Sequence, residues 1–320
     1  MNDKNSTLIK RLSIILAIQI VILIFVNVFS FSSLKTRQVS KELFKGLNKQ
    51  TIVSFELNDS IDGFKAVLED KKWFIEYEGT KLPADADKIK DYLDILGNLS
   101  DGFVTYTGSD EKSDATYGLD QKVVQNLTIK NNKSKEFKLQ IGSVGSRRGT
   151  TYIRKDGENR VRQIDSNLKA MSTALYKDWT DRRIVTGKTA SDLKSIRFDL
   201  NLDFFKSDYT IMSGPDNVYS VIPESENREL DQLIVKGLVN SLLTLKSDNF
   251  KISGNLDGKS RIGNIQLEFK TGTQILEFYP ADGDDIGNFI VKTESSPYLF
   301  LFHKDTLEKM FKTKDGLYKI

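Results

Sequence analysis

The sequence predicts an α+β fold in which an N-terminal transmembrane helix precedes two similar α+β units, each an antiparallel-rich sheet with packed helices. Three observations support this prediction: a charge-free apolar run near the N-terminus, apolar–polar alternation along much of the remaining chain, and a strand–helix–strand order that occurs twice. Phe (19) and Tyr (11) are plentiful whereas Pro (5) is scarce, which is typical of folded β-rich domains.

The apolar run extends from Leu12 to Phe31 and contains no charged residue. As a helix it is about 30 Å long, which matches the hydrocarbon core of a bilayer. No small-residue cleavage motif follows it, and the chain has no Cys for lipid attachment. We interpret the run as an uncleaved signal anchor; the alternative is a signal peptide cleaved near Ser33.

Basic residues flank the run on both sides, so the positive-inside count does not decide its orientation. A short tail before a long C-terminal domain usually remains in the cytoplasm. We therefore expect residues 1–11 to be a cytoplasmic tail, 12–31 to cross the cell (inner) membrane once, and the large C-terminal domain to be extracytoplasmic. The lipid bilayer is then the first expected partner.

The rest of the chain divides into three expected segments. Residues 33–50 carry apolar residues among basic ones, which predicts a juxtamembrane helix or stalk. The first α+β unit covers 51–185 and the second covers 195–314. The boundary between the units is expected near the polar stretch 181–195.

The first unit begins with a strand meander and continues with a helix. Ile89, Tyr92 and Leu96 share one helical face, and Asp85 is placed to cap the helix N-terminus. Expected strands lie at 51–57, 64–69, 73–77, 103–106, 127–130, 137–141, 151–155 and 160–164, with a short helix at 166–174.

The second unit repeats this order. Its expected strands lie at 196–202, 209–212, 218–221, 265–269, 274–279, 289–293 and 298–303, with helices at 230–245 and 305–311. We interpret the repetition as an internal duplication; the alternative is chance similarity between common strand–helix patterns. The proposed correspondences pair Leu127 with Leu267, Phe137 with Ile275, Tyr152 with Phe289 and Leu168 with Leu307.

A series of short motifs in the first unit resembles a bacterial family, the domain of unknown function 4340. The motifs are Trp73, Leu82-Pro83-Ala84-Asp85, Tyr117-Gly118-Leu119-Asp120, Ile141-Gly142 and Tyr152-Ile153-Arg154, in this order over 63–185. The resemblance implies an anchored extracytoplasmic protein of unassigned activity. It also implies a link to gliding-motility-type ABC transport systems, and it supplies no catalytic residues.

The residues predict no catalytic, cofactor or metal site. His303 is the one histidine, so a Cys/His zinc site is excluded. The segment Gly142–Gly149 lacks the Gly-Lys-Ser/Thr ending of a P-loop and is interpreted as a hairpin turn. The carboxylates at Asp282–Asp285 do not follow EF-hand spacing and are interpreted as a solvated turn. We therefore expect a protein that is not an enzyme.

Two residue groups are considered as contact sites for a ligand or partner: the two tryptophans and a set of five arginines. Trp73 and Trp179 are interpreted as core residues rather than sugar-stacking platforms. A net charge of +3 argues against a nucleic-acid protein. The candidate contact surface, for anionic lipid or an acidic partner, consists of Arg147, Arg148, Arg154, Arg160 and Arg162.

These observations predict a non-catalytic, membrane-anchored extracytoplasmic auxiliary or scaffold subunit of an ABC-type transport complex. Its expected partner is a membrane protein, a permease or an auxiliary subunit. The alternative is an envelope module that binds glycan or a surface protein. A minor alternative is an envelope hydrolase whose acidic residues are not recognisable in the sequence.

Overall fold

The computed structural model describes residues 19, 42–225, 228–252, 256–282 and 287–319. The predicted anchor Leu12–Phe31 lies outside these residues, except for Gln19. Within the described ranges, no helix combines the length and apolarity needed to cross a membrane.

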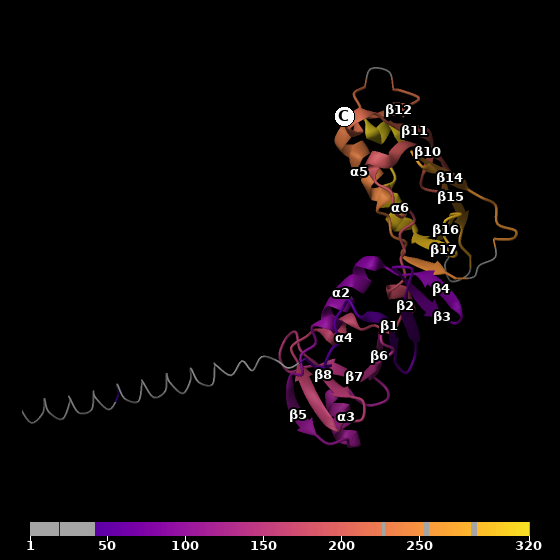
Figure 1. Ribbon diagram of the computed structural model, residues 1–320. Helices are drawn as coiled ribbons and strands as arrows, with labels where there is room; N and C mark the ends of the chain where they lie inside the picture. Colours follow the sequence, from indigo (N-terminus) through magenta and orange to yellow (C-terminus); the bar gives the residue numbers. More distant parts are fainter. Residues whose placement is uncertain (1–18, 20–41, 226–227, 253–255, 283–286, 320) are drawn as a thin grey trace, which may run out of the picture. The chain divides into compact units, whose positions relative to one another are not determined.

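The described chain is α+β, with two antiparallel sheets and few helices (Figure 1). The first sheet has nine strands in the order β4-β3-β2-β1-β6-β7-β8-β9-β5. Their bounds are β1 Ile52–Asn58, β2 Gly63–Glu69, β3 Lys72–Tyr77, β4 Thr80–Pro83, β5 Phe103–Thr107, β6 Gln125–Asn131, β7 Glu136–Val144, β8 Thr151–Lys155 and β9 Arg160–Ile164.

The second sheet has eight strands in the order β12-β11-β10-β14-β15-β16-β17-β13. Their bounds are β10 Leu193–Asn201, β11 Lys206–Ser213, β12 Tyr219–Ile222, β13 Asn249–Lys251, β14 Gly263–Phe269, β15 Gly272–Pro280, β16 Asn288–Lys292 and β17 Leu299–His303. When β4 is set aside, both sheets have the same order along the chain, so the prediction of two similar sheet units is confirmed.

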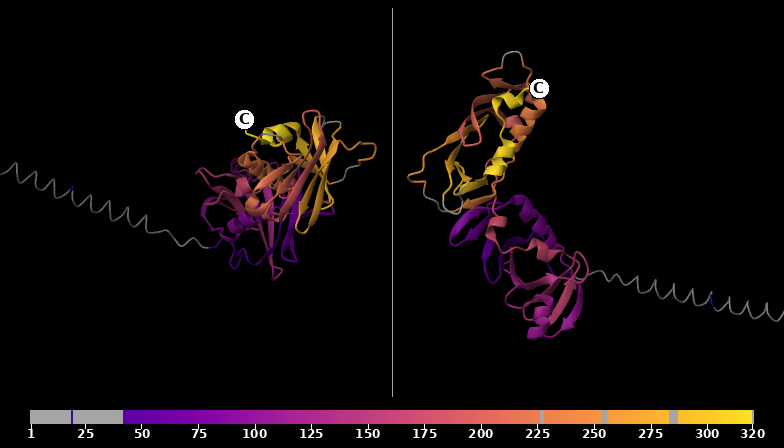
Figure 2. Two further views of the ribbon diagram at one scale, coloured as in Figure 1. Left: turned by 90° about the horizontal axis from the view of Figure 1, so that it is seen from above. Right: turned by 180° about the vertical axis from the view of Figure 1, so that it is seen from behind.

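The helices are short and alternate with the strands. Their bounds are α2 Ala86–Gly97, α3 Glu111–Tyr117, α4 Leu168–Met171, α5 Gln232–Leu243 and α6 Lys304–Met310, with 3₁₀ turns at Tyr176–Asp178, Ala190–Asp192, Pro215–Asn217 and Lys314–Leu317. Helices α5 and α6 contact each other and lie along one face of the second sheet (Figures 1 and 2). The Asp85 cap of α2 is confirmed, because its carboxylate accepts the backbone N–H groups of Asp87 and Lys88.

The sheet registers correct the residue correspondences predicted between the two units. One lateral row of the first sheet pairs Gln125, Ile141, Ile153, Arg162 and Val104. The equivalent row of the second sheet pairs Gly263, Phe278, Val291, Phe300 and Phe250. By this register Leu127 matches Ile265 rather than Leu267, Phe137 matches Gln274, and Tyr152 matches Ile290. The slip is two residues at Leu127, which keeps its side chain on the same face, but one residue at Phe137 and Tyr152, where the predicted partners lie on the opposite face.

The contacts divide the chain into two compact units that do not coincide with the two sheets. One unit contains residues 42–63 and 90–174 of the described chain; the other contains 64–89 and the described residues from Leu175 onward. The segment 64–89, which the sequence assigns to the first unit, therefore groups with the second.

Two segments of the chain have local structure that the sequence did not predict. Residues 42–50, the described part of the expected juxtamembrane helix or stalk, form a bridge and turns rather than a helix; Gly46 has a left-handed φ of 79°, and Leu43 and Leu47 are buried. The segment that follows β5 contains helix α3, which Asp110 caps at one end and Gly118, in the left-handed conformation, caps at the other.

Candidate functional site

The outer strand β5 exposes two large apolar side chains. Phe103 is 54% exposed and Val104 is 47% exposed. In the second sheet, the equivalent of Val104 is Phe250, which is fully buried and packs against Tyr176 and Tyr298. Equivalent strands of the two sheets therefore direct their apolar residues to different environments.

A buried arginine next to β5 accounts for this difference. Arg162 is only 4% exposed and is the cross-strand partner of Val104, whereas Phe300 is the partner of Phe250. The guanidinium of Arg162 lies 3.1 Å from the carboxylate of Asp101 and 2.5 Å from that of Glu158. A charged group cannot form the apolar floor that would bury Val104, so the valine side chain remains at the surface.

The end of β5 is joined to helix α3 by a carboxylate. Tyr106 donates its hydroxyl to Asp110 at 2.6 Å, and Ser113 donates both its hydroxyl and its backbone N–H to the same carboxylate. The hydrogen bonds from Ser113, followed by the bond from Tyr106, lower the pKa of Asp110 to about 2. Asp110 is therefore an anion at neutral pH and holds the loop that follows β5.

The four outer strands of the two sheets differ in how they discourage further pairing. Strand β4 contains Lys81 and Pro83, β13 contains Lys251, and β12 is followed directly by Pro223. Lysine and proline are common devices against edge-to-edge association. Strand β5, with the sequence FVTYT, contains neither. Its composition is that of a strand that another chain can approach.

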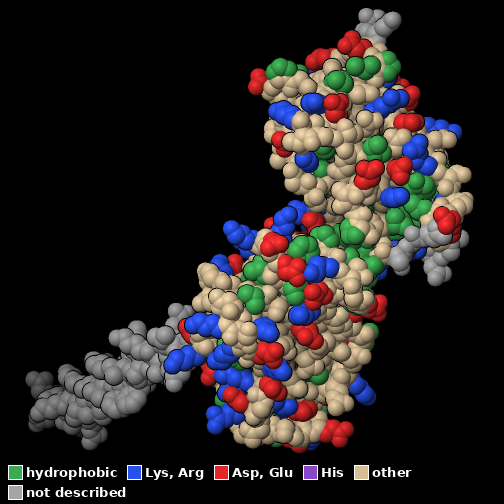
Figure 3. All heavy atoms as spheres, turned by 45° about the vertical axis from the view of Figure 1, so that its right-hand side comes forward, with side chains coloured by type: hydrophobic (Ala, Val, Ile, Leu, Met, Phe, Trp, Pro, Cys, Tyr) green, Lys and Arg blue, Asp and Glu red, His purple; other side chains and the backbone are tan. Residues whose placement is uncertain are grey.

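The five arginines of the predicted contact surface do not share one environment. Arg147, Arg148 and Arg160 are exposed, whereas Arg154 and Arg162 are buried. Arg154 is paired with Asp114 (Nη1–Oδ2 3.2 Å), and Arg147 lies 3.2 Å from Asp165. Arg154 and Arg162 therefore form internal ion pairs beside β5, whereas the ion pair of Arg147 is exposed. On the face drawn in Figure 3, blue and red side chains are interspersed.

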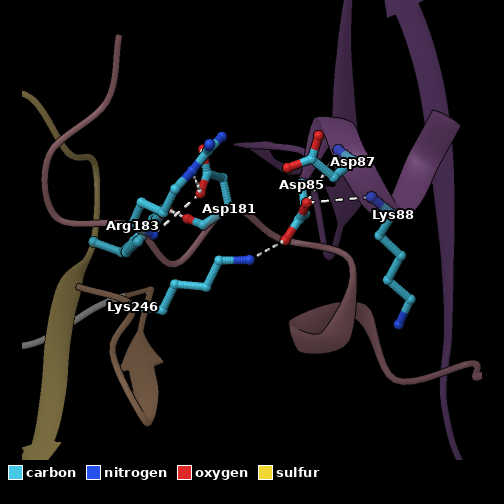
Figure 4. A network of polar contacts seen from close by, with 7 residues as sticks. Asp85, Asp87, Lys88, Asp181, Arg183 and Lys246 are labelled. Carbon is cyan, nitrogen blue, oxygen red and sulfur yellow. Dashed lines mark hydrogen bonds and ion pairs between the residues drawn. The ribbon is translucent and has the colours of Figure 1, made fainter. Parts of the chain in front are cut away.

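A second polar network lies in the compact unit that contains α5 (Figure 4). Lys246 donates to the Asp85 carboxylate at 3.0 Å, and Arg183 binds both oxygens of Asp181 through Nε and Nη2. Burial opposes ionisation of Asp85, but the bonds from Lys246 and the backbone of α2 outweigh it, so the pKa of Asp85 is lowered. The bonds with Asp181 raise the pKa of Arg183.

Trp179 and Lys88 lie next to this network. Trp179 is fully buried, which confirms its prediction as a core residue, and the Lys88 ammonium lies 4.4 Å from its ring centroid. Burial lowers the pKa of Lys88. Trp73, the other predicted core tryptophan, is half-buried on β3.

Two adjoining cavities lie in this unit, and the Arg183–Asp181 pair lines the smaller one. One, of about 130 Å³, is lined by this pair together with Tyr298 and Ser295; the other, of about 360 Å³, shares Thr186 and Ser295 with it. The Gln274 amide organises the larger cavity, because it donates to Thr293, Ser295 and the carbonyl of Ile184. The result is a groove rich in hydroxyl groups, with charges of both signs.

The remaining residues considered in the sequence occupy structural positions. His303 is exposed, precedes α6 and contacts Asn288 through Nδ1 at 2.8 Å. The described end of the carboxylate segment, Asp282, is paired with Lys259; residues 283–286 lie outside the described chain. Within the described ranges, no three His, Cys, Asp or Glu side chains are grouped as metal ligands would be.

The sequence pattern predicted the strand β5, but it did not predict that β5 lies at the edge of its sheet. Edge position depends on the pairing of β5 with β9, which the sequence separates by more than fifty residues. The available signal was the absence of lysine and proline from an apolar strand, together with the arginine on its partner strand.

The comparisons with known proteins give one match. The model of the family "Domain of unknown function (DUF4340)" matches residues 73–257, more than half of the chain. The match extends beyond Val185, where the resemblance noted in the sequence ended, and includes Asp85, Asp181 and Lys246. Neither the curated proteins nor the solved structures contain a match. The chain belongs to the DUF4340 family.

Proposed function

We propose that this protein is a non-catalytic auxiliary subunit of an ABC-type transport complex, anchored in the cell membrane by Leu12–Phe31 and extracytoplasmic beyond it. The apolar run supports the anchor, and the family resemblance supports the association with transport. The observation that carries the proposal is the open apolar edge at β5, since a scaffold needs a surface on which a protein partner is held.

The chemistry of this edge suits a protein partner. Phe103 and Val104 present an aromatic and an aliphatic side chain on opposite faces of the strand, and full burial of such side chains contributes roughly 1.5–3 kcal/mol each. Aromatic residues in the centre of an interface are frequent hot spots. The ion pairs of Arg162 hold the residue beside Val104 in one arrangement, which reduces the ordering cost of binding on that face.

The test is copurification from membranes in mild detergent after crosslinking. The native chain should recover a permease and an ATPase. Replacement of both apolar residues by serine, Phe103→Ser with Val104→Ser, should reduce recovery at least tenfold. The matched control is Asn249→Ser on β13, which should recover both subunits as the native chain does. Recovery of neither subunit by the native chain would overturn the proposal.

The hydroxyl-rich groove favours a second candidate, an envelope module that binds glycan. Its Arg183–Asp181 pair and its Thr and Ser hydroxyl groups offer donors and acceptors without an excess of one charge. A pulldown with peptidoglycan distinguishes the two candidates. Signal lost in Gln274→Leu but retained in the β5 double variant supports glycan binding, whereas no signal from the native chain excludes it.

A further inference from the structure

We infer that β5 binds an extended segment of its protein partner as an additional strand, with an apolar residue beside Val104 and an acidic residue near Arg160. This inference rests on the proposed function, because it specifies how the partner is bound. Three features of the edge support it: its free backbone side, its apolar residues, and an uncommitted cation.

The backbone of β5 has a single strand neighbour. It pairs antiparallel with β9 and ends the sheet order on that side, so within the described chain its other side faces no strand. The polar groups on that side need a partner or water. An extended segment satisfies them through the regular ladder of a sheet, as in recognition by strand addition.

The apolar residues select what the added strand carries. Side chains directly opposite in neighbouring strands lie about 4.5–5.5 Å apart at Cβ, so a residue added beside Val104 would contact it. Arg162 already occupies the opposite neighbour on β9 and is committed to Asp101 and Glu158. Valine or isoleucine on the incoming strand would therefore cover Val104 and leave the ion pairs intact.

Arg160 supplies the positive charge that selects which residue stands at one end of the added strand. This exposed residue is the cross-strand partner of Thr107, and among the described residues it forms no ion pair. A residue added beside Thr107 lies about 10 Å from Arg160 across two strand spacings, a distance that two long side chains can span. An acidic residue there is complementary, and such an exposed ion pair contributes little affinity and mainly fixes the register.

The probe is a fluorescent synthetic peptide, Thr-Val-Thr-Val-Thr-Glu, titrated against the full chain in detergent. The native chain should bind it, with slowed hydrogen exchange at Phe103–Thr107. A peptide with the same side chains but every backbone N–H methylated should bind at least tenfold more weakly. Equal binding of the two peptides would overturn strand addition, as would no binding of the unmodified peptide up to 1 mM.

Charge reversal tests the register. Arg160→Glu should weaken the Glu-ended peptide about threefold and strengthen a Lys-ended version by a similar factor. The matched control Arg148→Glu should change neither. If Arg160→Glu changes the affinity of the two peptides equally, the acidic residue of the added strand does not lie near Arg160.

Self-association is the competing use of this edge. Sedimentation of the chain alone that shows a dimer, lost in Val104→Lys, would overturn the inference in favour of a second copy. If the peptide does not bind but the native chain still copurifies with the transport subunits, only binding by strand addition is excluded. If the peptide binds but no transport subunit copurifies, only the proposed role in a transport complex is excluded.

Discussion

The two sheets have the same strand order but different chemistry at one equivalent place. In the second sheet Phe250 and Phe300 face each other and are both buried; in the first sheet Val104 and Arg162 face each other, and the valine is half exposed. The topology therefore does not determine which strand edge is closed. One buried charge on the neighbouring strand is enough to leave an apolar edge open.

This difference separates two kinds of contribution to stability. The aromatic pair stabilises its sheet through burial, which is largely insensitive to pH and salt. The ion-paired arginine stabilises its sheet only while its partners remain, because a buried charge without them is costly. Substitutions in either sheet can alter one side of this comparison at a time.

The largest effect is expected from Phe250→Ala. Removal of a fully buried aromatic side chain should lower the free energy of unfolding by about 3–5 kcal/mol. The equivalent change in the first sheet, Val104→Ala, removes a half-exposed side chain and should lower it by less than about 1 kcal/mol. Chemical denaturation of the full chain in detergent measures both. Similar losses for the two variants would contradict the assignment of β5 as an open edge.

A smaller loss is expected from Arg162→Met. Asp101 and Glu158 would lose Arg162 but keep Lys155, which lies 3.1 Å and 3.9 Å from them, and both carboxylates are about a third exposed. The cost should therefore be about 2 kcal/mol rather than the roughly 3–5 kcal/mol of a fully buried pair. Denaturation again provides the measurement.

A triple variant sharpens this result. Asp101→Ser, Glu158→Ser and Arg162→Phe introduce the residues that the second sheet has at the equivalent positions, Ser247, Ser296 and Phe300. It should recover most of the stability lost in Arg162→Met and reduce the exposure of Val104. If the triple variant is as unstable as the single one, the ion pairs are not a substitute for the aromatic contact.

The smallest effect concerns Asp85 in the second polar network. Its folded-state pKa is lowered below the usual 3.8, so its contribution to stability is complete above that value and is lost as the pH falls through the folded-state pKa. Asp85→Asn should therefore be about 0.5–1 kcal/mol less stable than the native chain at pH 7. The difference should shrink as the solution is acidified below pH 4.

The control for this titration is Asp87→Asn, on the same helix turn and exposed. Its difference from the native chain should be small at pH 7. If the difference in unfolding free energy between Asp85→Asn and the native chain widens on acidification, folding does not lower the pKa of Asp85.

Local patterns predicted the strands and helices well, because alternation and caps are properties of neighbouring residues. The hairpin of β8 and β9 and the Asp85 cap are examples. Strands β4 and β13 escape this pattern because each has a single buried apolar residue, Leu82 and Phe250, and so shows no alternation. The five arginines illustrate the limit for the site: burial of Arg154 and Arg162 depends on Asp114 and Asp101, which are distant in sequence.

The most direct test of the open edge uses the absence of cysteine from the chain. Single cysteines placed at Thr105 on β5 and at the equivalent Lys251 on β13 can be crosslinked in native membranes, and the products can be identified by mass spectrometry. We expect Thr105→Cys to give a crosslink to a transport-complex subunit and Lys251→Cys to give none. Equal crosslinking at both strands, or products that contain only this chain, would contradict the account.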